Sequence, residues 1–173
     1  MSEKKYVFKV CLLGEPNVGK TSLVYRFVKN IFKENLASTI GVNISKKSIQ
    51  LDGKDIKIHL WDLGGDQKFQ PMRDTFLAGA RGALLVFDLT NKKTLENIDK
   101  WIKHFENIMG KQPMVLVGNK ADLLDHIEIN ESELKQVAEE RNIPFIITSA
   151  KTGENVENAF KNLTIEMMKK SKI

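Results

Sequence analysis

Short apolar runs alternate along the chain with stretches in which apolar residues recur at helical spacing. Runs bounded by turn residues predict strands, and apolar residues three and four positions apart predict helices. The predicted strands are residues 5–13, 42–51, 54–61, 82–88, 113–118 and 143–148. The predicted helices are about 20–30, 67–79, 92–109, 131–141 and 154–170. This alternation predicts an α/β fold, with a doubly wound, mostly parallel, six-stranded sheet and helices on both faces.

The second and third predicted strands form a hairpin. They are joined by "LDGK" at residues 51–54, and an Asp-Gly pair is typical of a tight two-residue turn. This strand pair is therefore expected to be antiparallel and to lie at the edge of the sheet. In the third strand Ile56, Ile58 and Leu60 alternate with polar or amphipathic residues, so one face is expected to be buried.

The composition predicts one globular domain over residues 1–173, because 42% of the residues are hydrophobic and 28% are charged. No apolar run approaches the roughly 20 residues that span a bilayer. Cys11 lies inside an apolar strand-like run, where a buried and unreactive thiol is expected. We expect a cytoplasmic monomer with at most weak peripheral membrane contact.

The chain is basic, with 27 Lys and Arg against 22 Asp and Glu. All but four of the basic residues are lysines, and they are spread along the chain without aromatic interleaving. This pattern is typical of a solvated surface and does not predict specific nucleic-acid binding.

A phosphate-binding loop follows the first strand. "GEPNVGKT" at residues 14–21 matches the pattern G-x-x-x-x-G-K-[ST] and opens the first helix. Backbone N–H groups and the positive end of the helix dipole attract phosphates there. Lys20 is expected to reach the β- and γ-phosphates, and the Thr21 hydroxyl is expected to ligate Mg²⁺.

A second motif indicates which base is bound. "NKAD" at residues 119–122 follows an apolar strand and presents Asp122, which can only accept hydrogen bonds. Guanine offers two parallel donors, N1–H and the 2-amino group, whereas adenine has an acceptor at N1. "TSAKTG" at residues 148–153 adds the Ala150 N–H for guanine O6 and Lys151 over the ring. The predicted ligand is therefore GTP or GDP.

With these three motifs in order at strand ends, the chain resembles the Ras superfamily of small GTPases over its whole length. "STIGVN" at residues 38–43 and the hairpin resemble the Rab branch, whereas "WDLGG" at residues 61–65 resembles the Arf branch. The Pro-Asn pair of the phosphate loop is similar to that of bacterial ribosome-associated GTPases. The Rab resemblance implies signalling and vesicle traffic.

The resemblance also implies residue roles. Phe32 would stack on the guanine edge, and Thr39 would close over the γ-phosphate and complete the Mg²⁺ shell. Asp62 would hold a Mg²⁺ water, and the Gly65 N–H would touch the γ-phosphate. Both switch contacts depend on the γ-phosphate, so its loss would release residues about 32–41 and 63–76.

The predicted site residues fall into three groups. The catalytic candidates are Lys20, Thr39, Gly65, Asp66 and Gln67. The nucleotide-binding candidates are Gly14, Glu15, Pro16, Asn17, Val18, Gly19, Lys20, Thr21, Ser22, Phe32, Thr39, Gly65, Asn119, Lys120, Asp122, Ser149, Ala150 and Lys151. The Mg²⁺ candidates are Thr21, Thr39 and Asp62.

Effectors, exchange factors and activating proteins are expected to bind the switch regions. Ile44, Trp61 and Phe76 occupy places where Rab-like proteins display an apolar patch. Trp61 lies opposite the buried alternation of its strand, which favours exposure. Partial packing against the second helix is the alternative.

The position after Gly65 usually holds glutamine in this superfamily, but here it holds Asp66, followed by Gln67. A carboxylate cannot donate to the transition state, and its charge faces an anionic γ-phosphoryl group. Three interpretations compete. Gln67 replaces the missing glutamine, or hydrolysis is slow and a partner supplies the missing stabilisation, or the protein never turns GTP over usefully. We favour slow hydrolysis that a partner accelerates.

The main functional hypothesis is a molecular switch that hydrolyses GTP. A GTP-binding interaction module without useful hydrolysis is the alternative from another class, and only turnover separates the two. A ribosome-assembly GTPase is a third hypothesis, weakened because no RNA-binding domain follows residue 170.

Overall fold

The sheet has the predicted six strands. The computed structural model describes residues 4–173. The strands are β1 (Lys5–Leu13), β2 (Val42–Leu51), β3 (Lys54–Leu63), β4 (Gly82–Asp88), β5 (Met114–Asn119) and β6 (Phe145–Ile147). Their order is β2-β3-β1-β4-β5-β6, in which β2 and β3 pair antiparallel and the other neighbours pair parallel. The predicted fold class and edge hairpin are confirmed.

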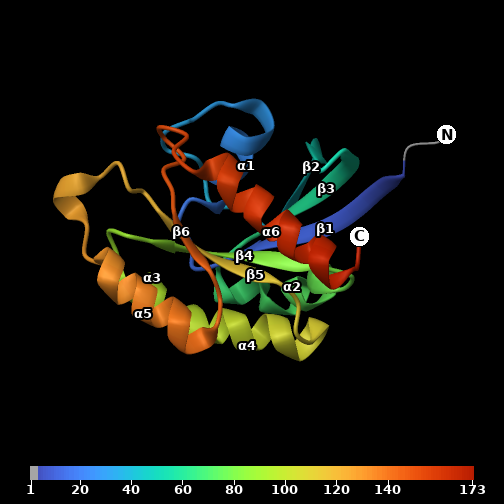
Figure 1. Cartoon of the computed structure of the whole chain (residues 1–173). Coiled ribbons are helices and arrows are strands. Elements are labelled where there is room, and N and C mark those ends of the chain that lie inside the picture. Colours follow the sequence, from blue (N-terminus) through green and yellow to red (C-terminus); the bar gives the residue numbers. More distant parts are fainter. Residues whose placement is uncertain (1–3) are drawn as a thin grey trace.

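Helices cover both faces of the sheet. They are α1 (Lys20–Lys29), α2 (Gln70–Leu77), α3 (Lys92–Glu96), α4 (Ile98–Met109), α5 (Glu131–Arg141) and α6 (Val156–Lys170), with short 3-10 turns η1 (Gln67–Phe69) and η2 (Leu124–His126). Helices α1 and α6 pack on one face, where Phe27 and Phe160 stack at 4.1 Å, and α2, α4 and α5 lie on the other (Figure 1). Among residues 4–173, no helix combines the length and apolar character needed to cross a bilayer.

Two predicted helices differ from the structure. The helix predicted over 67–79 is the turn η1 followed by α2, because Pro71 lacks an N–H and fits only the first turn of a new helix. The helix predicted over 92–109 is interrupted at Asn97, whose ψ of 1° leaves the helical region between α3 and α4. Asparagine disfavours helix interiors because its side chain competes for backbone groups.

The loops that carry the three motifs gather at one edge of the sheet. Because β1, β4, β5 and β6 are parallel, the chain leaves β1, β5 and β6 at the same edge. In open α/β sheets, ligands bind outside the carboxyl ends of the strands. The fold therefore brings the phosphate loop together with both base motifs.

Candidate functional site

The phosphate loop depends on glycines that no other residue can replace. Gly14 and Gly19 have φ values of 150° and 99°, which L side chains rarely adopt. A Cβ at Gly14 would lie 2.1 Å from the Val86 carbonyl oxygen, and one at Gly19 would lie 2.2 Å from the Asn119 side-chain nitrogen. The loop therefore packs directly on β4 and on the first base motif.

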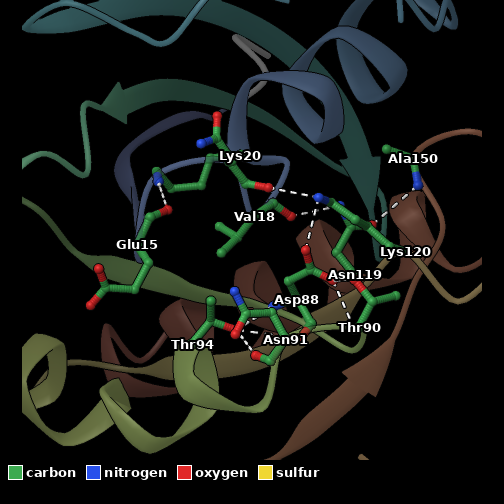
Figure 2. Close-up of polar contacts among 11 residues, drawn as sticks. Glu15, Val18, Lys20, Asp88, Thr90, Asn91, Thr94, Asn119, Lys120 and Ala150 are labelled. Carbon is green, nitrogen blue, oxygen red and sulfur yellow. Dashed lines mark hydrogen bonds and ion pairs between the residues drawn. The ribbon is translucent and has the colours of Figure 1, made fainter. Parts of the chain in front are cut away.

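Lys20 is the buried cation of this loop. Its Nζ donates to the carbonyl oxygens of Gly14 and Glu15, at 2.8 Å in each case. Burial lowers the pKa of Lys20 to about 8, although the carboxylates of Asp62 and Glu15 raise it in part. An ammonium group has three N–H donors, so one remains for an anion beyond these two bonds. Figure 2 shows Lys20 beside Glu15.

The three predicted Mg²⁺ residues converge. The Thr21 hydroxyl donates to Asp62 Oδ2 at 2.5 Å and lies 2.7 Å from the Thr39 hydroxyl, which is 3.5 Å from Asp62 Oδ2. Asp62 is 1% exposed, and its Oδ1 has no hydrogen-bond partner among the described residues. Burial raises the pKa of Asp62, while the Thr21 hydrogen bond opposes this. Two hydroxyls beside an unpaired buried carboxylate oxygen form the oxygen donor set that Mg²⁺ prefers, so these residues fit the ion.

Asn119 connects the phosphate loop to the base motifs. Its Nδ2 donates to the Val18 carbonyl oxygen at 3.1 Å, and its Oδ1 accepts from the Ala150 N–H at 3.2 Å (Figure 2). The same Oδ1 accepts from the Thr148 hydroxyl at 3.1 Å. The residue is 2% exposed. Ala150 N–H, predicted to bind guanine O6, therefore donates to Asn119 in this structure.

Lys120 and Asp122 have partners of their own. Lys120 Nζ donates to the Asn17 carbonyl oxygen at 2.7 Å and pairs with Asp88 at 2.8 Å. The Ser149 hydroxyl donates to Asp122 Oδ1 at 2.7 Å, which orients the carboxylate predicted to read guanine. Sequence reasoning missed Asp88, although a lone acid at the end of an apolar strand could have indicated it.

A cavity of about 610 Å³ runs between these groups. The predicted residues that line it are Pro16, Asn17, Gly19, Lys20, Thr21, Ser22, Phe32, Thr39, Gly65, Asp66, Asn119, Lys120, Asp122, Ala150 and Lys151. The remaining predicted residues do not line it: Gly14, Glu15, Val18, Asp62, Gln67 and Ser149. Each of these residues except Gln67 forms a hydrogen bond with a residue that lines the cavity.

Comparison with known proteins agrees with this geometry. A family model described as the Ras family matches residues 9–169. Ras-related protein Rab-11B of Dictyostelium discoideum is 41% identical over 162 residues, which are 93% of this chain and 74% of that protein. Ras-related protein Rab-8B of Homo sapiens is 37% identical over 166 residues, covering 95% and 80%. Ras-related protein Rab-10 of Diplobatis ommata is 36% identical over 176 residues, covering 100% and 88%.

The chain belongs to the Ras family. Its Rab-like character is confirmed. As a Ras-family protein, it is a GTP-binding molecular switch with GTPase activity, and it interacts with effectors and regulators. Ras-family GTPases bind GTP and GDP, generally with Mg²⁺.

Gly65, which is predicted to contact the γ-phosphate, packs directly on the phosphate loop. A Cβ at Gly65 would lie 2.5 Å from the Gly14 carbonyl oxygen and 2.6 Å from the Pro16 nitrogen. Together with the Thr21–Thr39 contact of 2.7 Å, this brings both switch regions against the loop. Across the cavity, Glu34 of the first switch pairs with Lys151 at 3.4 Å. Residues of both predicted switch regions therefore contact residues that line the cavity.

Asp66 and Gln67 differ in their relation to the cavity. Asp66 lines it, but its carboxylate accepts from the Lys68 N–H at 3.0 Å and caps η1, and its side chain is 51% exposed. Gln67 is exposed and does not line the cavity. The Asp66 carboxylate is therefore engaged with the backbone of its own turn in this conformation.

Sequence reasoning missed Arg73, which holds the second switch. Its side chain is only 4% exposed, donates to the carbonyl oxygens of Gly64 and Asp66 at 2.7 Å each, and lies 4.8 Å over the Trp101 ring. Trp101 in turn donates to Glu15 of the phosphate loop at 3.4 Å. Arg73 lies four residues after Phe69 and four before Leu77, so it is a lone cation on an apolar helix face. That position could have indicated from the sequence that Arg73 is buried.

The predicted apolar patch is partly covered. Ile44 is 51% exposed, whereas Trp61 and Phe76 are half-buried with ring centroids 5.8 Å apart. Lys9 Nζ lies 3.7 Å over the Trp61 ring. Ile44 is therefore exposed, whereas Trp61 packs partly against Phe76 of α2.

Proposed function

We propose that this cavity is the GTP and GDP site, with the guanine at Asp122 and the phosphates at Lys20. The observation that carries the proposal is the convergence of Thr21, Thr39 and Asp62 next to the phosphate loop. Asp122, oriented by Ser149, accepts from the two guanine donors, and Lys151 covers the ring. Phe32 lines the same cavity and stacks at the edge of the base.

The phosphates bind at Lys20 and the loop N–H groups. Because Lys20 is buried, the charge of its ammonium group attracts an anion more strongly here than at the surface. Thr21 and Thr39 would supply hydroxyl oxygens to a Mg²⁺ ion, and Asp62, which accepts a hydrogen bond from Thr21, would hold the ion through a water. When bound, Mg²⁺ neutralises negative charge on the phosphates.

The two switch regions, about residues 32–41 and 63–76, report the γ-phosphate. Thr39 and the Gly65 N–H contact it, and both lie against the loop. Loss of the γ-phosphate removes both contacts and releases the two segments. Effector binding at Ile44, Trp61 and Phe76 then depends on the nucleotide state.

Intrinsic hydrolysis is slow in this proposal. Asp66 is engaged as the cap of η1, and a carboxylate at that position cannot donate to the developing charge. No arginine lies in residues 31–41, so the first switch supplies no arginine finger. A partner's arginine raises rates by roughly 10³ to 10⁵ in this chemistry.

The decisive experiment is nucleotide analysis of the purified protein combined with single-turnover GTP hydrolysis. We expect bound guanine nucleotide, slow turnover in the wild type, faster turnover in Asp66→Gln and no change in Gln67→Ala. If Gln67→Ala abolishes turnover and Asp66→Gln is no faster, Gln67 is the catalytic glutamine and slow hydrolysis through Asp66 is wrong. Complete absence of turnover with retained GTP binding would instead indicate an interaction module.

The broader setting follows from the Rab-like relatives. We propose a single domain over residues 1–173, of which residues 1–3 lie outside the described part. A cytoplasmic protein in signalling or vesicle traffic, with peripheral membrane contact at most, fits this class. Fractionation of cells that express a tagged full chain tests this location.

A further inference from the structure

One face of the sheet is basic where β1, β2 and β3 lie side by side, at the side of the molecule where the chain begins (Figure 1). In the register of these strands, Lys46 of β2 lies opposite His59 of β3, which lies beside Lys9 of β1. Lys57 is two residues before His59, so its side chain points to the same face. We call Lys9, Lys46, Lys57 and His59 the basic sheet face.

In the described part of the chain, the three lysines of this face are not paired with acids, and Asp55, which lies on the same face two residues before Lys57, is opposite Lys5 of β1. Lys46 and Lys57 are exposed, and Lys9 and His59 are half-buried. Among residues 4–173, none of the three lysines forms an ion pair with a carboxylate. Lys9 donates instead to the Ala78 carbonyl oxygen at 2.6 Å.

Two lysines flank His59 on this face, Lys46 on β2 and Lys9 on β1. Burial lowers the pKa of His59, and the charges of Lys46 and Lys57 lower it further. An anion bound beside the ring would be attracted by these lysines and would oppose their effect on the pKa of His59.

We propose that the basic sheet face binds an acidic polypeptide segment of a partner protein. The row next to Lys46 and His59 contains Ile44 opposite Trp61, so the face continues directly from the proposed effector patch. Lys9 joins the two surfaces, since its Nζ lies 3.7 Å over the Trp61 ring. The inference thus extends the partner contact proposed above, and it rests on that contact for its continuity.

The dimensions fit an extended acidic peptide. Same-side residues of a strand repeat at about 6.8 Å, and neighbouring strands are about 4.8 Å apart. Alternate carboxylates of an extended segment therefore match the spacing from Lys57 to the row of Lys46 and His59. Anionic membranes favour clusters of about four to eight Lys or Arg, and single-stranded nucleic acid needs stacking aromatics. Three lysines and a histidine are fewer than such a cluster, and the neighbouring Trp61 ring is already covered by Lys9 and Phe76, so both ligands are poorer fits.

Because a histidine such as His59 titrates near neutral pH, binding at this face is expected to depend on pH. A carboxylate beside the ring raises the pKa of His59, so binding takes up a proton and becomes tighter as the pH falls. The charged groups that face His59 are Lys46, Lys57 and Lys9, and none of them is a carboxylate or a second histidine. The pH dependence is therefore assigned to His59 itself.

The test uses the full chain loaded with GDP and a fluorescent peptide of alternating glutamate and serine. We expect fluorescence anisotropy to show binding that Lys46→Glu and Lys57→Glu each weaken on the order of tenfold. Lys135→Glu on the exposed face of α5 makes the same change in net charge and is expected to have little effect. Lys46→Gln and Lys57→Gln are expected to give a smaller loss in the same direction.

A second measurement compares affinities between about pH 7.5 and about pH 6. The wild type is expected to bind more tightly at the lower pH, and His59→Gln is expected to show no such gain. No binding, equal weakening by Lys135→Glu, or the same pH response in His59→Gln would each overturn the proposal.

Anionic vesicles and a single-stranded oligonucleotide serve as competing ligands. If either binds more tightly than the peptide and with the same dependence on Lys46 and Lys57, the partner is not an acidic polypeptide. Nucleotide binding and hydrolysis by each variant are measured in parallel. They are expected to stay unchanged, so failure of this inference leaves the proposed GTPase function intact.

Discussion

Removal of the Asn119 side chain is expected to separate the phosphate loop from the base motifs. Asn119→Ala deletes three buried hydrogen bonds, to Val18, Thr148 and Ala150. Each neutral hydrogen bond contributes a net of about 0.5–1.5 kcal/mol, so the free energy of unfolding is expected to fall by about 3 kcal/mol. For a chain of this size, that corresponds to a melting temperature lower by about 6–12 °C.

The assay is thermal and urea unfolding of the wild type and Asn119→Ala, with saturating GDP and Mg²⁺ and again after nucleotide removal. The free energy of unfolding is expected to fall in both conditions. The three hydrogen bonds join protein groups to one another, so they do not depend on bound nucleotide. Asp122→Ala is the matched control. It removes a residue proposed to bind guanine, but only the Ser149 bond is lost, so its effect is expected mainly with nucleotide present. A loss below about 1 kcal/mol in nucleotide-free Asn119→Ala would refute the reasoning.

Three further predictions concern the charged groups Lys20 and Arg73. Because the pKa of Lys20 is lowered to about 8, GDP binding at about pH 8.5 is expected to take up protons, measured by calorimetry in buffers of different ionisation enthalpy. The unfolded chain binds more protons above that pKa, so the stability of the nucleotide-free protein is expected to rise between about pH 8 and pH 10.5. Arg73→Met removes two hydrogen bonds from a charged donor, so amide exchange of residues 64–69 is expected to accelerate at least about tenfold.

Controls separate these effects from general charge loss. Arg81→Met removes an exposed arginine outside the second switch and is expected to leave exchange at residues 64–69 unchanged. Unchanged exchange in Arg73→Met would mean that other contacts hold the switch. Absence of proton uptake at about pH 8.5 would mean that Lys20 stays fully charged in the empty loop.

The topology was predictable because its signals are local. Apolar runs and the Asp-Gly turn predicted six strands and the antiparallel edge, and Asp52 and Gly53 adopt φ values of 50° and 71°, as a mirror-image turn requires. The interruption at Asn97 was not predicted, because the apolar period continues through it into α4. Helical periodicity reports which face is buried, and it is insensitive to a break of one residue.

The parts of the site that consist of sequence motifs were predictable. The parts that depend on tertiary packing were not. The phosphate loop and both base motifs lie at one sheet edge, as their order after successive strands indicated. The contact between Arg73 and Trp101 joins α2 to α4 and has no signature of spacing. Likewise, the use of Asp66 as a cap depends on η1, which the sequence did not reveal.

The packing of Gly65 on the phosphate loop has a consequence for how such a protein diversifies. Three backbone atoms within 2.7 Å of the Cβ position leave no room for a side chain at residue 65. The next two positions, Asp66 and Gln67, are exposed, and neither side chain is part of that contact. With the roles proposed for Gly65 and Asp66, the contact that senses the γ-phosphate and the residue that sets the hydrolysis rate would be neighbours in the sequence, so evolution could change the lifetime of the GTP state and leave the switch contact in place.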